Sequence, residues 1–226
     1  AYYSLEDKYS ELKSWYDGYR FGNQEIYNPW SIINYVKAAE LKHDEFPRAY
    51  WSNTSSNSII RELVEQADES TRGEIELLLA GKTLEKPIHE EVTYGDIHTS
   101  SDNLWNFLFF TGYLKDCGQR REEQDIYVKL AIPNREILYI YERTIKEWFD
   151  KKVKNTDRSP LLTALEVGDC QKAEEFISGQ LLDTISYYDY AENYYHGFLT
   201  GLLTGAPGYQ ILSNRESGTG RVDLII

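Results

Sequence analysis

The sequence contains no methionine and only two cysteines among its 226 residues. Average usage would place several methionines in a chain of this length. Methionine is therefore either truly absent or was omitted from the sequence in a modified form. Together with the alanine at position 1, its absence indicates a fragment of a longer protein.

Further absences exclude whole classes of protein. No apolar run approaches the roughly 18 residues of a membrane-spanning helix, so we expect no membrane partner. No basic region followed by an apolar stretch opens the chain, so we expect no secretory signal. The two cysteines, Cys117 and Cys170, match no metal-binding spacing. These features favour a reduced, cytoplasmic setting.

Basic residues are scarce relative to acidic ones. The chain has 24 lysines and arginines against 37 aspartates and glutamates, which gives a net charge of −13. Because phosphate binding needs a basic surface, this balance argues against nucleic acid as a partner. It does not exclude one, since a nuclease site is itself a carboxylate cluster and local charge matters more than the total.

Helical patterning dominates what is present, and the length suits one large or two small domains. We expect helices over residues 4–16, 29–41, 58–66, 71–79, 103–111, 135–153, 161–167, 170–182 and 190–203. We expect strands over residues 113–115, 126–132, 209–212 and 222–226, with a charged turn at 119–125 and a linker at 154–160. The fold class is therefore mostly α, with an α/β C-terminal part. Helix, strand, turn, strand, helix over 103–153 is the order of a winged-helix unit.

The segment Gly81-Lys82-Thr83 resembles the end of a phosphate-binding loop. The full loop needs a glycine five residues before Gly81, and Glu76 stands there. The end of the preceding helix explains Gly81 instead. The chain is therefore not expected to be an ATPase by itself.

Six short motifs occur in a fixed order. They are Trp15-Tyr16-Asp17-Gly18-Tyr19, Ile26-Tyr27-Asn28-Pro29-Trp30-Ser31, Trp51-Ser52-Asn53-Thr54-Ser55, Thr111-Gly112-Tyr113-Leu114, Ile132-Pro133-Asn134-Arg135-Glu136 and Gly220-Arg221-Val222-Asp223. With these motifs, nearly the whole chain resembles prokaryotic proteins that join an N-terminal AAA-ATPase-like domain to a C-terminal PD-(D/E)XK nuclease-superfamily domain.

The resemblance implies three regions. Residues 1–95 would be the helical end of the ATPase-like region, 96–153 a winged-helix-like connector, and 160–226 the N-terminal half of a restriction-endonuclease-like α/β domain. The ATPase core with its phosphate-binding loop would precede residue 1. ATP would then act only through that absent domain.

The resemblance also implies a catalytic site. In this superfamily carboxylates hold Mg²⁺ ions that polarise the phosphate, and a lysine orients or activates the water. Glu192 would be the acid on the first helix, and Asp223 the metal-binding acid at the start of the second strand. The Glu-x-Lys pair would lie beyond Ile226, so the chain as given would lack it. Arg215, Arg221 and His196 are candidates for contacting substrate.

Each candidate has a structural alternative. Glu192 would otherwise be a solvated acid, and His196 a hydrogen-bonded core histidine one turn away. Arg215 and Arg221 would otherwise pair with Glu216. Asp223 is harder to explain structurally, because it directly precedes three apolar residues.

Other chemistry-bearing residues have stronger structural explanations. His89, His98 and Asp96 have metal-like composition but no recognised spacing. Core packing explains the tryptophans better than base stacking does: Trp15, Trp30, Trp51, Trp105 and Trp148. The winged-helix-like unit offers DNA three arginines, but the acidity of the chain favours protein contacts there: Arg120, Arg121 and Arg135.

Two functions follow as expectations. The first is a Mg²⁺-dependent nuclease acting on DNA, or less readily on RNA, coupled to an ATPase-like module. The second is a non-catalytic interaction module with a degenerate nuclease-like domain, binding a protein partner or a second copy. A Glu-x-Lys strand in the next stretch of the gene would discriminate between them.

Overall fold

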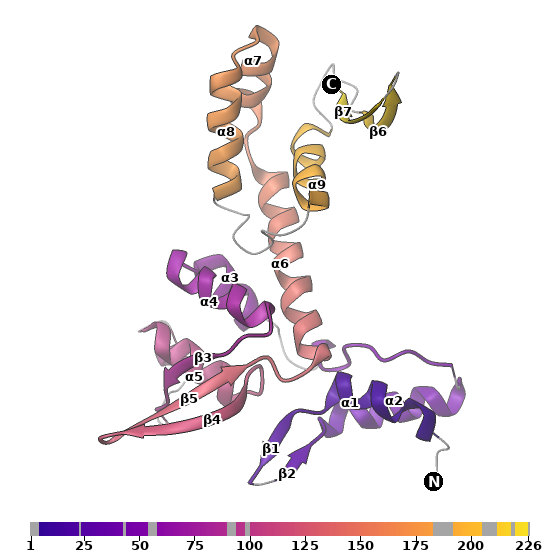
Figure 1. Ribbon diagram of the computed structural model, residues 1–226, viewed down its shortest axis with the longest axis vertical. Helices are drawn as coiled ribbons and strands as arrows, with labels where there is room; N and C mark the ends of the chain where they lie inside the picture. Colours follow the sequence, from indigo (N-terminus) through magenta and orange to yellow (C-terminus); the bar gives the residue numbers. More distant parts are fainter. Residues whose placement is uncertain are drawn as a thin grey trace. The chain divides into compact units, whose positions relative to one another are not determined.

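The computed structural model describes residues 5–22, 24–42, 44–53, 58–89, 94–97, 100–182, 192–204, 212–217 and 220–225. The chain divides into two compact units, residues 1–145 and 146–226, which we call unit 1 and unit 2. Figure 1 labels the elements of both. The boundary falls inside helix α6 (Arg135–Asn155). The domain limits suggested by the resemblance stay predictions.

Unit 1 opens with two helices joined by a small hairpin. The elements are α1 (Tyr9–Tyr16, entered through a 3₁₀ turn at Glu6–Lys8), β1 (Tyr19–Phe21), β2 (Gln24–Ile26) and α2 (Pro29–Leu41). Strands β1 and β2 pair antiparallel. The two helices share a buried cluster because their apolar side chains recur at helical spacing: Leu12, Tyr16, Tyr35 and Ala39.

A three-stranded sheet forms the second half of unit 1 (Figure 1). Its strands are antiparallel in the order β3-β5-β4, with β3 at Leu84–Pro87, β4 at Lys115–Glu122 and β5 at Asp125–Ala131. The accompanying helices are α3 (Ser58–Gln66), α4 (Glu69–Leu79) and α5 (Ser101–Phe110). Helix α5 carries the fully buried Trp105 and contacts β3.

Unit 2 consists of helices and one hairpin. Its elements are the end of α6, then α7 (Ser159–Val167), α8 (Cys170–Leu182), α9 (Glu192–Leu203), β6 (Leu212–Ser217) and β7 (Gly220–Ile225). A separate core joins the helices through Phe149, Leu161, Ala173, Phe198 and Leu202. Strands β6 and β7 pair antiparallel, and α9 contacts β7.

Local signals read from the sequence are confirmed at several helix ends. Asn28 caps α2 by accepting from the N–H groups of Trp30 and Ser31, and Pro29 is the first helical residue. Gly81 follows α4 with φ of +74°. Its N–H donates to Leu78 and that of Lys82 to Leu77, as in a Schellman motif. The segment that resembles a phosphate-binding loop therefore caps the C-terminal end of α4.

Several boundaries were wrong. The charged stretch 119–125 is mostly strand, because β4 extends to Glu122 and only residues 123 and 124 turn the chain. Strand β3 was missed. The linker expected at 154–160 shrinks to residues 156–158, since α6 ends at Asn155 and α7 begins at Ser159. In the terminal hairpin, β6 extends to Ser217 and β7 begins at Gly220, whereas strands were expected at 209–212 and 222–226.

The tryptophans follow the core expectation with one exception. Trp105 is fully buried, and Trp15, Trp51 and Trp148 are half-buried. Trp30 is 52% exposed on α2, so core packing does not explain it.

The described elements are mostly helical with small antiparallel sheets, which confirms the mostly α class. Within the described ranges, no helix is both long enough and apolar enough to cross a membrane.

Candidate functional site

Five of the six motifs come together in unit 1, and Glu136 lies where three of them meet. Glu136 is the second residue of α6 and is fully buried. Its carboxylate accepts from the Ser31 hydroxyl, at 2.9 Å to Oε1 and 2.7 Å to Oε2. Oε1 also accepts from the Trp51 N–H at 2.9 Å. One side chain thus holds together the beginnings of α2, α6 and the 3₁₀ turn at Trp51–Asn53.

Burial raises the pKa of Glu136 above its ordinary value, because desolvation disfavours the charged form. Hydrogen bonds from the Trp51 backbone and from Ser31 oppose this shift without reversing it. Position two of a helix also favours a negative charge, since the first N–H groups of the helix point towards it. Glu136 therefore stabilises the fold of unit 1, because its carboxylate oxygens accept hydrogen bonds from Ser31 and Trp51.

Two asparagines fix the neighbouring chain segments. Asn134 accepts from the N–H of Ile137 at 3.1 Å and donates its amide to the carbonyl of Asp17 at 2.9 Å. Asn28 donates its backbone N–H to the carbonyl of Tyr16 at 2.7 Å. The end of α1 is thereby tied to the beginnings of both α2 and α6.

Glycine is required where the motifs touch. Gly18 has φ of +99°, and a Cβ added there would lie 2.4 Å from the carbonyl oxygen of Pro133. Gly112 has φ of +84°, and its added Cβ would lie 3.0 Å from the Trp51 ring. That ring stacks on Tyr113, with centroids 5.2 Å apart and planes inclined by 13°. The motif residues therefore pack against one another directly.

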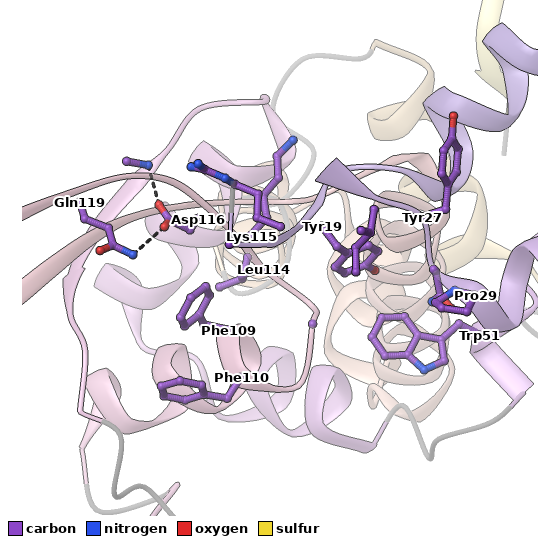
Figure 2. Close-up of a pocket in the computed structure, with 16 residues that line it drawn as sticks. Tyr19, Tyr27, Pro29, Trp51, Phe109, Phe110, Leu114, Lys115, Asp116 and Gln119 are labelled. Carbon is purple, nitrogen blue, oxygen red and sulfur yellow. Dashed lines mark hydrogen bonds between the residues drawn. The ribbon is translucent and has the colours of Figure 1, made fainter. Parts of the chain in front are cut away.

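This junction borders a cavity of about 910 Å³ within unit 1. The size lies in the range of small-molecule sites. Figure 2 shows Phe109, Phe110 and Leu114 on one side of the cavity and Tyr19, Trp51 and Pro29 on the other. The lining comes from β1, β2, α2, the Trp51 turn, α5 and β4. Segments far apart in the sequence thus build one concave surface.

Charge in the cavity differs in sign from that of the chain. The lining contains two cations, Arg20 and Lys115, and one carboxylate, Asp116. That carboxylate accepts from the Gly118 N–H at 2.6 Å and from the Gln119 amide at 2.7 Å, as Figure 2 shows. The cavity therefore carries a local positive excess in a chain whose net charge is −13.

The cavity is suited to binding. Its described lining includes aromatic and apolar side chains, two cations, amides and tyrosines, and none of the lining residues is a serine, threonine, cysteine or histidine. Such a set can hold a ligand with a flat apolar body and a negative charge. The described lining therefore has no serine, threonine or cysteine nucleophile and no histidine to serve as its base.

The predicted catalytic residues lie in unit 2, and their side chains fall outside the described part of the structure. Glu192 is the first residue of α9, and His196 lies farther along this helix. Asp223 is the fourth residue of β7, so its expected place at the beginning of the strand was wrong. The contact between α9 and β7 makes the two acid-bearing elements neighbours.

The two predicted phosphate-contacting arginines lie on the hairpin. Arg215 on β6 is paired in register with Val222. Arg221 on β7 lies directly opposite Glu216, which suits the ion-pair alternative for Arg221. These placements come from the backbone register alone.

The geometry does not support the histidines as metal ligands or Arg120 as a DNA contact. His89 donates its backbone N–H to Asn106, and His98 lies outside the described residues. No group of three or more His, Cys, Asp or Glu that could hold a metal occurs among the described residues. Arg120 pairs with Glu85 at 2.9 Å and with Glu122 at 2.5 Å, so its charge is compensated.

Sequence reasoning missed Glu136, Arg20 and Lys115 as site residues. An acid two positions after Asn134, in the first turn of the helix expected at 135–153, was the one available signal for Glu136. Arg20 and Lys115 gave no signal, because only the folded chain brings their strands together.

Comparisons of this chain with protein-family models, with curated proteins and with solved structures found no match.

Proposed function

We propose that this chain is part of a cytoplasmic, Mg²⁺-dependent nuclease of the PD-(D/E)XK class that acts on DNA and is coupled to an AAA-ATPase-like module. In this proposal unit 2 carries the first half of the nuclease-like domain, with a winged-helix-like connector before it. The observation that supports it is the contact of α9, which begins at Glu192, with β7, which contains Asp223.

The donor chemistry fits the proposed metal. Mg²⁺ prefers carboxylate oxygens and keeps several waters, so two acids on neighbouring elements are a suitable partial set. Bound Mg²⁺ would polarise the phosphate and stabilise the leaving oxygen. Glu192 and Asp223 would hold and orient it, and a Glu-x-Lys strand would complete the site.

The test is plasmid cleavage by the full-length protein in Mg²⁺. Asp223→Asn keeps the size of the side chain and removes its charge, so we expect cleavage to fall by at least about a hundredfold. Glu166→Gln, at an exposed position on α7, is the charge-matched control and should cleave like the wild type. Unchanged cleavage by the Asp223 variant would contradict the assignment.

A second candidate is a non-catalytic interaction module with a degenerate nuclease-like domain. The charge on the β4–β5 hairpin favours it. Arg120 is neutralised by Glu85 and Glu122, and Arg121 donates to the carbonyl of Glu123. Two of the three arginines that the winged-helix-like unit would offer to DNA are therefore already engaged by neighbouring groups, one of them in ion pairs. A full-length protein that cleaves neither DNA nor RNA in Mg²⁺ or Mn²⁺ would favour this candidate.

A further inference from the structure

Two cations line the cavity. Arg20 on β1 and Lys115 on β4 both line it, and β1 contacts β4. Neither side chain forms an ion pair with any residue that the structure describes. Asp116, the one carboxylate of the lining, accepts hydrogen bonds from the Gly118 N–H and the Gln119 amide, and the lining keeps an excess of one positive charge. Like charges on adjacent strands repel, so binding an anion between them would be favourable.

Aromatic side chains provide the second half of the site. Phe109 and Phe110 have ring centroids 5.2 Å apart and face the cavity opposite Tyr19 and Trp51 (Figure 2). Phe110 is 52% exposed and Ile26 is 39% exposed at the cavity edge. Apolar surface left in water is costly, and covering it with a flat ring is favourable. The cavity thus combines a stacking surface with an anion site.

The backbone around the cavity argues against an extended peptide. A peptide that adds to a sheet edge needs a row of free N–H and C=O groups. On β4 the register shifts between Asp116 and Gln119, and the N–H of Gly118 is taken by the Asp116 side chain. The edge of β4 that a peptide strand would pair with is therefore interrupted at the cavity. A compact ligand with one flat ring system and one anionic group fits better.

We propose that this cavity binds a nucleotide, with the base against Phe109 and Phe110 and the phosphate between Arg20 and Lys115. The same chemistry is offered by a free nucleotide and by one nucleotide of a single strand. In its single-strand form the inference rests on the proposed nuclease function, because the strand would then be the substrate.

The test is isothermal titration calorimetry of the full-length protein in EDTA, where no cleavage occurs. The probes are adenosine monophosphate and a thymidine oligonucleotide of about eight residues, with adenosine and inorganic phosphate as partial ligands. We expect R20Q/K115Q to weaken binding of the favoured probe at least about tenfold, and higher salt to weaken wild-type binding. Phe110→Ser should also weaken binding, because it removes stacking surface.

The matched control is K37Q/K42Q, which removes two exposed lysines near the end of α2 and should bind like the wild type. Circular dichroism and thermal unfolding check that both double variants are folded. Binding of the monophosphate that R20Q/K115Q weakens identifies a free-nucleotide site in this cavity, and binding of the oligonucleotide alone that the same variant weakens identifies a single-strand site.

The inference is overturned if neither probe binds at millimolar concentration, or if R20Q/K115Q binds as tightly as the wild type. Binding of an acidic aromatic peptide in place of both probes would overturn it as well. A protein that cleaves in Mg²⁺ but fails this test retains the proposed function, and one that binds without cleaving retains only the cavity assignment.

Discussion

At the scale of single residues, Glu136 joins distant parts of unit 1. Its partner Ser31 is 105 positions away and its partner Trp51 is 85 positions away. The buried Ser31 hydroxyl and the partly buried Trp51 N–H would both lose this acceptor if the carboxylate were removed, and an unsatisfied buried donor costs about 1–3 kcal/mol. The residue therefore acts as an internal support for the cavity wall formed by Trp51.

The raised pKa of Glu136 predicts a specific pH dependence. Above the ordinary pKa of 4.5, the folded protein binds more protons at this site than the unfolded chain. This contribution to the free energy of unfolding therefore falls as pH rises. Glu136→Gln exchanges no proton and can still accept from the Trp51 N–H. We expect its stability relative to the wild type to increase from about pH 4.5 to 7, measured by urea denaturation.

Glu40→Gln is the control for this comparison, because Glu40 is exposed on α2. Its stability relative to the wild type should change little over the same pH range. If the wild type instead became more stable relative to Glu136→Gln as pH rises, the charged carboxylate would be stabilised by its surroundings, and the prediction would be wrong.

Residue-scale prediction succeeded where the cause is local. The cap at Asn28 and the helix ending at Gly81 depend on neighbours within a few positions, so the sequence contains the whole argument. The roles of Glu136, Arg20 and Lys115 depend on partners or on strands brought together by folding. No periodicity or spacing in the sequence encodes those contacts.

At the scale of elements, the junction between β1 and the beginning of α6 sets the most stringent requirement. Gly18→Ala would place a Cβ 2.4 Å from the backbone oxygen of Pro133, at a φ that L-residues avoid. We expect it to lower the free energy of unfolding by more than about 2 kcal/mol. Gly22→Ala, also at positive φ but with no atom within 4 Å, should cost only about 1 kcal/mol. Equal losses in thermal or urea unfolding would contradict the close approach.

Elements were predicted best where apolar periodicity is strong. Helices α2, α3 and α8 have the expected bounds, because their buried stripes repeat at helical spacing. The second half of β4, residues 119–122, was read as a turn because it is exposed and charged. Those charges pair across strands, as Arg120 does with Glu85, and a single stretch of sequence does not reveal such pairing.

At the scale of the whole molecule, each unit has its own core. Leu202 is fully buried in the unit 2 cluster, and Ile75 is fully buried in unit 1. Truncating either to alanine costs about 2–5 kcal/mol. We expect Leu202→Ala to raise hydrogen exchange in α7, α8 and α9 but not in α1 and α2. Ile75→Ala should leave α7 and α8 protected. Equal increases in both units for both variants would show one cooperative core.

Class and helix content followed from the sequence, but the division into units did not. A polar segment near 154–160 suggested a domain boundary, which stays a prediction, and the two compact units divide inside the continuous α6. The helical periodicity of apolar residues continues through residues 145 and 146. The sequence therefore does not indicate that the helix passes from the core of unit 1 to the core of unit 2 at this point.

The two cysteines are distributed one to each unit. Cys117 lies in β4 between two residues of the cavity lining, and Cys170 begins α8. Both thiols are free and exposed. A pair of spin labels can therefore be attached to the unmodified sequence, and their separation would report directly on the distance between the units. The label at Cys117 would at the same time sense ligand entering the cavity, so one sample would record both occupancy and any accompanying movement.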